Sequence, residues 1–404
     1  MGIEMTDLED AKGIAGAAGK PQFSGNGTNI ALGELCEILN GYAFKSKRYV
    51  DEGIRVIRIA NVQKGYLEDS HPCFYPATEK GSIAQFLLYE NDLLLSLTGN
   101  VGRVALLDNK FLPAALNQRV ACLRIKDESL LNKRYLFHCL NSMCFENRCI
   151  ESANGIAQKN LSTVWLRGYA IPVPQMDKQL EIARRFDLIQ AQISRAKAQI
   201  VKLDVLVKSR FIEMFGDITE QYLLGERLET TSGGTPSRKH PEYYEGGSIP
   251  WLTSGEVNKG KIDTPDHFIT EAGLRNSSAK LVPANSVVVA MYGATAGQVG
   301  LVTYETTTNQ AVCCIKPNAC VAPVFLRYAL EFKKDWMIDQ CAGGAQPNIS
   351  QGIVKKVAIP DVTLARQQEF ADFASQVDKL RFDVQQQIDK LELLKNSLMQ
   401  EYFG

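Results

Sequence analysis

Two glycine-rich stretches of this 404-residue chain have the spacing that comes closest to a cofactor site. Gly293–Gly300 follows an apolar run, and Gly13–Lys20 places glycines ahead of a lysine. A phosphate-binding loop needs Lys followed by Ser or Thr, between a strand and a helix, because those side chains contact phosphate and metal. Gln298 follows Gly297, and Lys20 precedes a proline. We therefore interpret Gly293–Gly300 as a tight turn and expect no nucleotide site in either stretch.

Other side chains that could catalyse a reaction or bind a metal do not form complete sets. The ten cysteines include no Cys-x-x-Cys pair, which favours reduced, buried thiols in a cytoplasmic protein over a zinc site or a disulfide framework. Glu331-Phe332-Lys333 matches half of a nuclease signature, but it lies in a helical pattern. The histidines lack ligand or triad spacing and are expected to be ordinary surface or core residues: His71, His138, His240 and His267. We expect no catalytic residue, cofactor or metal in this chain.

The composition predicts two or three cores of ordinary domain size, since 45% of the residues are hydrophobic. The 45 basic and 45 acidic side chains balance, which argues against indiscriminate nucleic-acid binding but permits local phosphate-binding patches. No apolar run reaches the roughly 18 residues of a membrane span, which predicts a soluble protein. Met1–Asn29 is rich in Gly and Ala and acidic where a signal peptide would be basic, so we interpret it as a mobile leader.

A long helix is predicted from Gln175 to Phe215, and its pattern appears twice. Apolar residues recur there at steps of three and four without an internal proline, and a rod of some forty residues would be about 60 Å long. The same pattern closes the chain after Ile359-Pro360. The two narrow apolar seams include Ile189, Ile193, Ala196, Ile200 and Leu203 in the first helix and Val377, Leu380, Val384, Leu391 and Leu394 in the second.

The repeat extends beyond the helices into the segments between them. An offset of 188 residues joins Gln179 to Gln367 and Ser209 to Ser397. We predict a leader (1–29), a first domain (30–174), a first helix (175–216), a second domain (217–360) and a second helix (361–404). The paired motifs of the two domains are an opening Leu-Gly-Glu (Leu32–Leu35, Leu224–Arg227), a glycine turn (Gly99–Arg103, Gly293–Gln298), Asn-Gln before a strand (Asn117-Gln118, Asn309-Gln310) and Gln-x-Asn-x-Ser (Gln158–Ser162, Gln346–Ser350).

Within each domain we expect strands before the glycine turn and a short helix after the Asn-Gln strand. The strands are predicted at Ile54–Val62, Leu93–Leu97, Ile249–Thr253 and Ser286–Met291, and the helices at Leu130–Asn141 and Pro323–Phe332. The segments Gly41–Arg48 and Ser232–Gly247 occupy the same slot but share no pattern. A duplicated frame with two divergent surfaces indicates two different ligands.

This order of motifs, given twice over residues 30–404, resembles the specificity (DNA-recognition) subunit of type I restriction-modification systems. Ser232–Ser237 with Ile249-Pro250-Trp251 looks like a common form of that family's target-recognition domain. The first glycine turn departs from the pattern, because it is one residue shorter than the second and lacks its Ala-Thr. The resemblance implies an α+β fold with two target-recognition domains in tandem, whose long helices pack as an antiparallel coiled coil with pseudo-two-fold symmetry.

The resemblance also implies a non-catalytic subunit that binds double-stranded DNA with a bipartite recognition sequence. Each domain would read one half, and the helices would set the spacer and dock two methyltransferase subunits along the seams and their flanks. Adenine methylation and endonuclease activity would belong to partner subunits, which would bind S-adenosylmethionine and ATP/Mg. The resemblance leaves open whether restriction subunits are among these partners. The chain itself has no Asn/Asp-Pro-Pro-aromatic loop of an adenine methyltransferase.

Basic, amide and hydroxyl side chains in the divergent segments and turns are the candidates for DNA contacts, since Arg and Lys donate to guanine or phosphate and Gln pairs with adenine. These candidates are Lys45, Lys47, Arg48, Lys64 and Arg103 in the first domain and Ser237, Arg238, Lys239, Lys259, Tyr292 and Gln298 in the second.

Two other classes of protein compete with the DNA-recognition subunit. One is a non-catalytic coiled-coil scaffold with two ligand-binding domains, which would show a homodimeric seam and sustained charge pairing beside it. The other is an enzyme with a nucleotide at its glycine turns, which would bind ATP or S-adenosylmethionine by itself.

Overall fold

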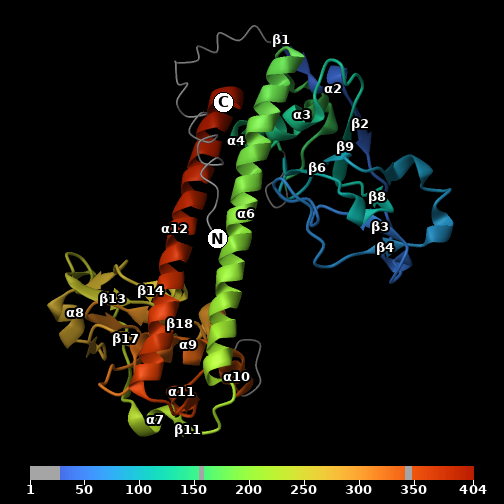
Figure 1. The fold of residues 1–404 in the computed structure, drawn as a ribbon. Helices are drawn as coiled ribbons and strands as arrows, with labels where there is room; N and C mark the ends of the chain where they lie inside the picture. Colours follow the sequence, from blue (N-terminus) through green and yellow to red (C-terminus); the bar gives the residue numbers. More distant parts are fainter. Residues whose placement is uncertain (1–27, 154–158, 342–347) are drawn as a thin grey trace. The chain divides into compact units, whose positions relative to one another are not determined.

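The computed structural model describes residues 28–153, 159–341 and 348–404 (Figure 1). Contacts divide the chain into two compact units, one that runs to Ser194 and includes Asp389–Gly404, and one formed by Arg195–Ile388. Residues 1–27 of the predicted leader lie outside the described residues. Its last two residues differ from the prediction, because Thr28 and Asn29 belong to strand β1 and pair with the end of the first domain.

Unit 1 contains two four-stranded sheets, and the side chains of strand β6 (Leu93–Ser96) enter two different cores. The antiparallel sheet has the order β2-β9-β6-β7, formed by Cys36–Asn40, Val120–Ile125, Leu93–Ser96 and Val104–Leu106. The mixed sheet has the order β4-β3-β8-β5, formed by Phe74–Tyr75, Ile54–Ile57, Ala114–Leu116 and Leu87–Leu88, with β3 and β8 parallel. Leu93 and Leu95 pack into one core and Leu94 into another, since successive side chains of a strand point to opposite faces.

Unit 2 repeats this plan with one more strand. Its first sheet has the order β12-β20-β17-β18-β14, formed by Thr230–Ser232, Val312–Ile315, Ser286–Ala290, Val299–Val302 and Lys261–Ile262. The second has the order β15-β13-β19-β16, formed by Phe268–Ile269, Ile249–Leu252, Thr306–Thr308 and Leu281–Val282. Val287 and Val289 enter one core and Val288 the other. The four predicted strand runs are confirmed, and the first is shorter than predicted because it ends at Ile57.

The opening and closing motifs of each copy meet in a two-stranded sheet. In unit 1, β1 (Thr28–Ala31) pairs with β10 (Ala170–Val173), and in unit 2, β11 (Gln221–Leu223) pairs with β21 (Ala358–Pro360). The Leu-Gly-Glu motifs form the short helices α2 (Leu32–Leu35) and α7 (Leu224–Arg227). The remaining short helices are α3 (Lys133–Leu140), α4 (Met143–Ser152), α5 (Thr163–Gly168), α8 (Glu271–Arg275), α9 (Pro323–Glu331), α10 (Lys334–Asp339) and α11 (Gln351–Lys355).

The two predicted long helices are α6 (Met176–Phe215) and α12 (Leu364–Phe403), each of 40 residues (Figure 1). Within unit 1 they run in opposite directions, since Phe186 stacks on Phe403 at 5.8 Å between ring centroids while Gln190 accepts a hydrogen bond from Lys395. Each unit thus contains the start of one helix beside the end of the other.

The same antiparallel packing recurs in unit 2, where the ring centroids of Phe211 and Phe370 are 5.3 Å apart and Arg381 forms an ion pair with Asp204. The seam residues Ile189, Ile193, Val377 and Val384 are buried, and Ala196, Ile200, Leu203 and Leu391 are half-buried. None of the helices in the described ranges is long and apolar enough to cross a bilayer.

Leu380 and Leu394 correct the predicted seam of α12. Both are exposed, by 54% and 41%. Val377, Val384 and Ile388 are buried and follow a spacing of three and four residues. The same spacing passes through Arg381 and Lys395, each one residue after a predicted leucine. Long basic side chains occupy these two seam positions, because their stems can pack while their charged ends reach a partner on α6. The two leucines therefore face outward from the helix pair.

Candidate nucleic-acid interface

Backbone hydrogen bonds join the motifs that are spread along the first domain. Tyr42 N donates to Leu116 O at 2.8 Å, and Gln118 N donates back to Tyr42 O at 3.0 Å. Leu97 N, before the glycine turn, donates to Arg119 O at 2.9 Å. Leu161 N, from the Asn-x-Ser segment, donates to Leu97 O at 2.7 Å, so the four segments form one frame.

Unit 2 builds the same frame from its own copies. Gly234 N donates to Thr308 O at 2.9 Å, and Met291 N donates to Ala311 O at 2.8 Å. Ile349 N donates to Met291 O at 2.9 Å, which matches the bond between Leu161 and Leu97 in unit 1. Gln158, Gln346 and Pro347 of the predicted motifs lie outside the described residues.

The glycine turns are confirmed as tight turns. Gly99 and Gly102 have φ of +72° and +80°, and Gly293 and Gly297 have φ of +75° and +78°, the left-handed region that glycine adopts at little cost. The second glycine turn contains a short 3-10 turn at Gly293–Thr295 and leads into strand β18. A phosphate-binding loop would instead lead into a helix. Within the described residues, no cluster of His, Cys, Asp and Glu could hold a metal ion.

Three of the predicted contact residues of the first domain lie together around the 3-10 turn Ser46–Arg48. Lys45, Lys47 and Arg48 are exposed there. Arg48 forms an ion pair with Glu79, and its guanidinium lies 5.1 Å from the centroid of the Tyr75 ring. The turn rests on a small core that is rich in aromatic side chains, including Tyr42, Phe44, Tyr49 and Tyr75.

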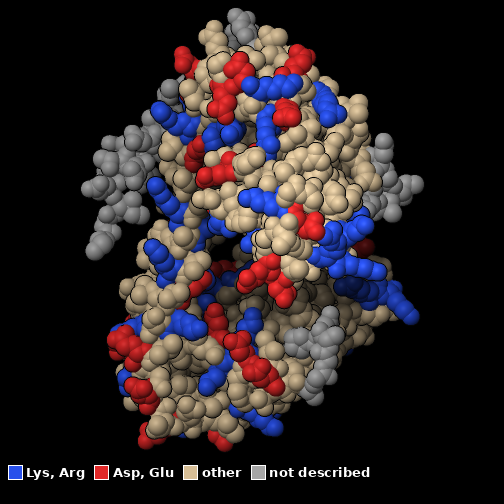
Figure 2. All heavy atoms as spheres, turned by 90° about the vertical axis from the view of Figure 1, so that its right-hand side faces the viewer, with Lys and Arg blue, Asp and Glu red and all other residues tan. Residues whose placement is uncertain are grey.

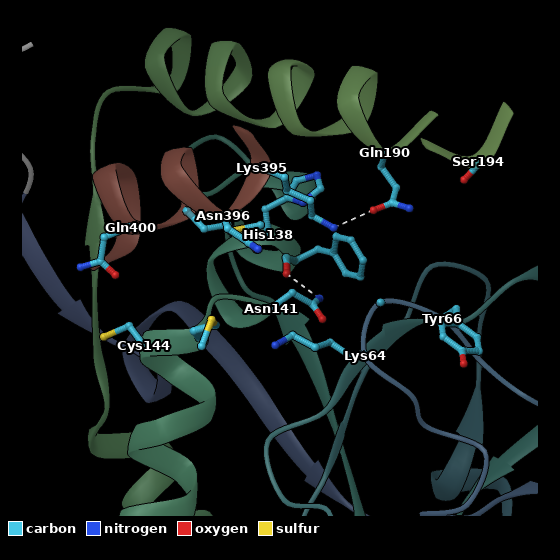
Figure 3. Close-up of a pocket in the computed structure, with 14 residues that line it drawn as sticks. Lys64, Tyr66, His138, Asn141, Cys144, Gln190, Ser194, Lys395, Asn396 and Gln400 are labelled. Atoms are coloured by element: carbon cyan, nitrogen blue, oxygen red, sulfur yellow. Dashed lines mark hydrogen bonds between the residues drawn. The ribbon is translucent and has the colours of Figure 1, made fainter. Parts of the chain in front are cut away.

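Lys64 and Arg103 form a second group in unit 1, away from the turn at Ser46–Arg48. Arg103 donates to Gln63, next to Lys64, and Lys64 Nζ lies 2.5 Å from Glu146 Oε2. Lys64 also lines a cavity of about 570 Å³ between its loop, α3, α4 and the helix pair (Figure 3). The other labelled lining residues of the cavity are Tyr66, His138, Asn141, Cys144, Gln190, Ser194, Lys395, Asn396 and Gln400.

Beside this cavity, His138 and Asp187 form a contact that the sequence did not predict. His138 is 3% exposed, and its Nε2 lies 2.7 Å from Asp187 Oδ1. Burial lowers the pKa of His138, against the opposing effect of Asp187. Burial alone would raise the pKa of Asp187, but hydrogen bonds from His138 and Arg134 lower it to about 2. Asp187 is therefore ionised at neutral pH and ties α3 to α6.

The predicted contact residues of unit 2 fall into three places. Ser237, Arg238 and Lys239 are exposed in the divergent segment. Lys259, at the end of a 3-10 turn (Ser254–Lys259), lies 2.5 Å from Asp266. Tyr292, 40% exposed, and the half-buried Gln298 belong to the glycine turn and hence to the shared frame: Tyr292 forms a bridge with Asn348.

Charge is mixed on the face of the molecule that Figure 2 shows. Figure 2 shows basic and acidic side chains interspersed on the visible face, in keeping with the 45 residues of each kind. Such a surface offers local phosphate contacts without an extended basic field.

Comparisons with known proteins follow this duplication closely. The family model for the type I restriction modification DNA specificity domain matches residues 27–203 and again residues 219–393. The chain belongs to this family. It carries two such domains in tandem, and specificity subunits are the non-catalytic, DNA-recognition components of type I systems.

Known specificity subunits are similar to this chain over much of its length. The EcoBI specificity subunit of Escherichia coli is 23% identical over 92% of this chain and 83% of its own length. The EcoR124I/EcoR124II specificity subunit of Escherichia coli is 23% identical over 68% of this chain and 69% of its own length. The crystal structure of the type I S subunit from M. genitalium has the same fold, with a TM-score of 0.59 at 15% identity over 95% of this chain and 98% of that one.

Proposed function

We propose that this specificity subunit reads a bipartite DNA target, with one half-site read by each domain. The observation that carries the proposal is the duplicated frame with unlike surfaces. At the same slot, unit 1 presents a basic 3-10 turn on an aromatic core, whereas unit 2 presents Ser237–Lys239 beside Tyr244 and Trp251, whose rings are 5.9 Å apart. One frame that holds two different sets of side chains can read two different sequences.

The partners of the subunit are proposed to be two methyltransferase subunits, with restriction subunits as further partners in the cytoplasm. S-adenosylmethionine and ATP/Mg would bind to those partners, so adenine methylation and DNA cleavage would be their reactions. The antiparallel packing of α6 and α12 within each unit suits two partners of one kind, because each unit offers equivalent helix segments.

The outward faces of the long helices are proposed as the docking surfaces. On α6, Val201, Val205 and Ile212 are more than half exposed, and on α12, Leu380 and Leu393 are too. Apolar side chains along a helix are suited to cover by a partner helix. The buried seam residues then hold the helix pair together and are not themselves available to the partner. We also propose that the length of the two helices sets the number of unread base pairs between the half-sites.

Methylation mapping of a host that carries the partner subunits tests the function. With this chain we expect adenine methylation at one split motif, and without it we expect that methylation to disappear. The isolated chain should bind neither ATP nor S-adenosylmethionine in titration calorimetry. Tight binding of either compound by the chain alone, or methylation that is independent of the chain, would contradict the proposal.

A further inference from the structure

Gln118 and Gln310 occupy equivalent exposed corners of the two frames, at the end of the Asn-Gln motif that both domains share. The preceding asparagine shapes each corner: Asn117 Oδ1 accepts from Arg119 N at 3.2 Å, and Asn309 Oδ1 accepts from Ala311 N at 3.1 Å. Both glutamines are exposed. The asparagine is thus used within the turn, and the glutamine is projected outward from it.

In unit 2, the Gln310 amide is oriented by the divergent segment. The Thr235 hydroxyl donates to Gln310 Oε1. A carbonyl oxygen has two lone pairs, so Oε1 can accept a second hydrogen bond while Nε2 donates outward. The amide therefore presents a donor and an acceptor with a defined direction.

Thr235 is itself held in place from several sides. On one side Gly234 N donates to Thr308 O at 2.9 Å, and Trp251 Nε1 donates to Gly234 O at 3.0 Å. On the other side Tyr244 Oη donates to Pro236 O at 2.5 Å. Buried contacts on a short segment fix the side chain that lies between them, which is what selective recognition requires.

The two residues before Thr235 lie so close to neighbouring backbone and side-chain atoms that only glycine fits there. A Cβ at Gly233 would lie 1.8 Å from Thr308 O, and one at Gly234 would lie 2.1 Å from Ser278 Oγ. In unit 1, a Cβ at Gly41 would lie 2.3 Å from Asn117 O, so the close approach recurs. The position that corresponds to Thr235 in unit 1 is Ala43, which has no hydroxyl to orient Gln118.

From this arrangement we propose that Gln310 contacts a base edge in the half-site of the second domain, with Thr235 as its positioning residue. Gln118 takes the equivalent place in the first domain without such a partner. A glutamine amide that can donate and accept at once matches adenine, through N7 and N6 in the major groove. The proposal rests on the proposed function of the chain and names one base-reading residue for each half-site.

Four variants of the complete complex with its methyltransferase subunits test this proposal by methylation mapping and by binding to duplexes with single base-pair changes. Gln310→Ala should lose about tenfold or more of the discrimination at one position of one half-site. Thr235→Ala, which copies Ala43, should weaken discrimination at the same position, and Thr235→Ser should restore it because it keeps the hydroxyl. Gln118→Ala should relax one position of the other half-site only.

The outcomes separate this inference from the proposed function. If the wild-type complex methylates no split motif, the proposed function fails. If it does, an unchanged motif in assembled Gln310→Ala complex overturns the base contact, and so does uniform weakening on all sequences, which would indicate a phosphate contact. If the Gln310→Ala complex does not assemble, the Thr235→Ala complex provides the test. Unchanged base discrimination at every position of that half-site would then overturn the inference as well.

Discussion

Gln179 and Gln367 make the same three hydrogen bonds in the two units, 188 residues apart. Gln179 Oε1 accepts from Asn132 N at 2.8 Å, and its Nε2 donates to the carbonyls of Leu130 and Pro174. Gln367 Oε1 accepts from Ala322 N at 2.9 Å, and its Nε2 donates to the carbonyls of Cys320 and Val362. Both side chains are buried. Each glutamine joins the first turn of a long helix to the start of the short helix that packs on it.

Replacing either glutamine by leucine should destabilise its own unit. The substitution leaves a buried N–H and two carbonyls without their partner, and such groups cost about 1–3 kcal/mol when unsatisfied. The matched control is Gln368→Leu, since Gln368 is exposed and its amide donates to the side chain of Asp372 on the same helix. Urea unfolding of the three variants provides the measurement. A Gln367→Leu variant as stable as the Gln368→Leu control would show that these bonds do not hold the junction.

The duplication could be predicted from the sequence because it depends on local signals. The three-and-four period placed α6 and α12 to within a few residues, and the order of motifs matched the frame that both units build. The positions of Leu380 and Leu394 could not be predicted the same way. Each is adjacent to a basic seam residue, and a pattern of apolar letters assigns the seam to the leucine instead of to Arg381 or Lys395.

Side-chain contacts between elements that are distant in the sequence could not be predicted either. Asp187 lies in a helix with many charged residues, and nothing in its neighbourhood distinguishes it before α3 brings His138 to it. Gln310 was visible in a shared motif, but the orienting hydroxyl of Thr235 comes from the divergent segment. The sequence signal that points to Gln310 is the glutamine that both copies of the duplication keep, at Gln118 and Gln310.

The buried seam and the outward faces of the long helices should respond differently to an added charge. Ile193→Asp, at a position 3% exposed, should destabilise unit 1 by several kcal/mol, because a buried carboxylate without a partner is costly. Leu393→Asp, at a position 71% exposed, should leave the isolated chain as stable as the wild type and weaken its complex with methyltransferase subunits. Thermal unfolding and co-purification report the two effects. Full stability of Ile193→Asp would contradict a buried seam.

Acidification should destabilise unit 1 through His138. Burial lowers the pKa of this histidine in the folded state, so below its unfolded value of about 6.5 the unfolded chain binds more protons. The stabilisation from the neutral ring is therefore present above that pH and is lost as the pH falls toward the folded value, by at most about 1.4 kcal/mol per pH unit. Urea unfolding at pH 7.5 and 5.5 measures this loss.

His138→Gln should reduce this pH dependence, because an amide can still donate to Asp187 but does not titrate. The exposed His71 supplies the control, and His71→Gln should keep the wild-type dependence. Equal pH dependence in both variants would assign the effect to other groups.

The exposed pair Arg238 and Lys239 should contribute to DNA affinity in the complete complex. Replacing both by alanine is expected to weaken binding and to lower the slope of log affinity against log salt by about one for each phosphate that is no longer bound. The comparison is Lys316→Ala, since Lys316 is a basic residue of the same unit that forms an ion pair with Glu229. Unchanged affinity, motif and salt slope would show that Arg238 and Lys239 are merely solvated.

Exchange of one domain followed by methylation mapping tests the central claim most directly. Residues 30–174 would be replaced by the corresponding domain of another specificity subunit, with both long helices left intact. Because each unit carries its own frame and its own divergent surface, we expect one half of the methylated motif to change while the other half and the spacer stay the same. A motif in which both halves change together, or in which neither changes, would contradict the assignment of one half-site to each domain.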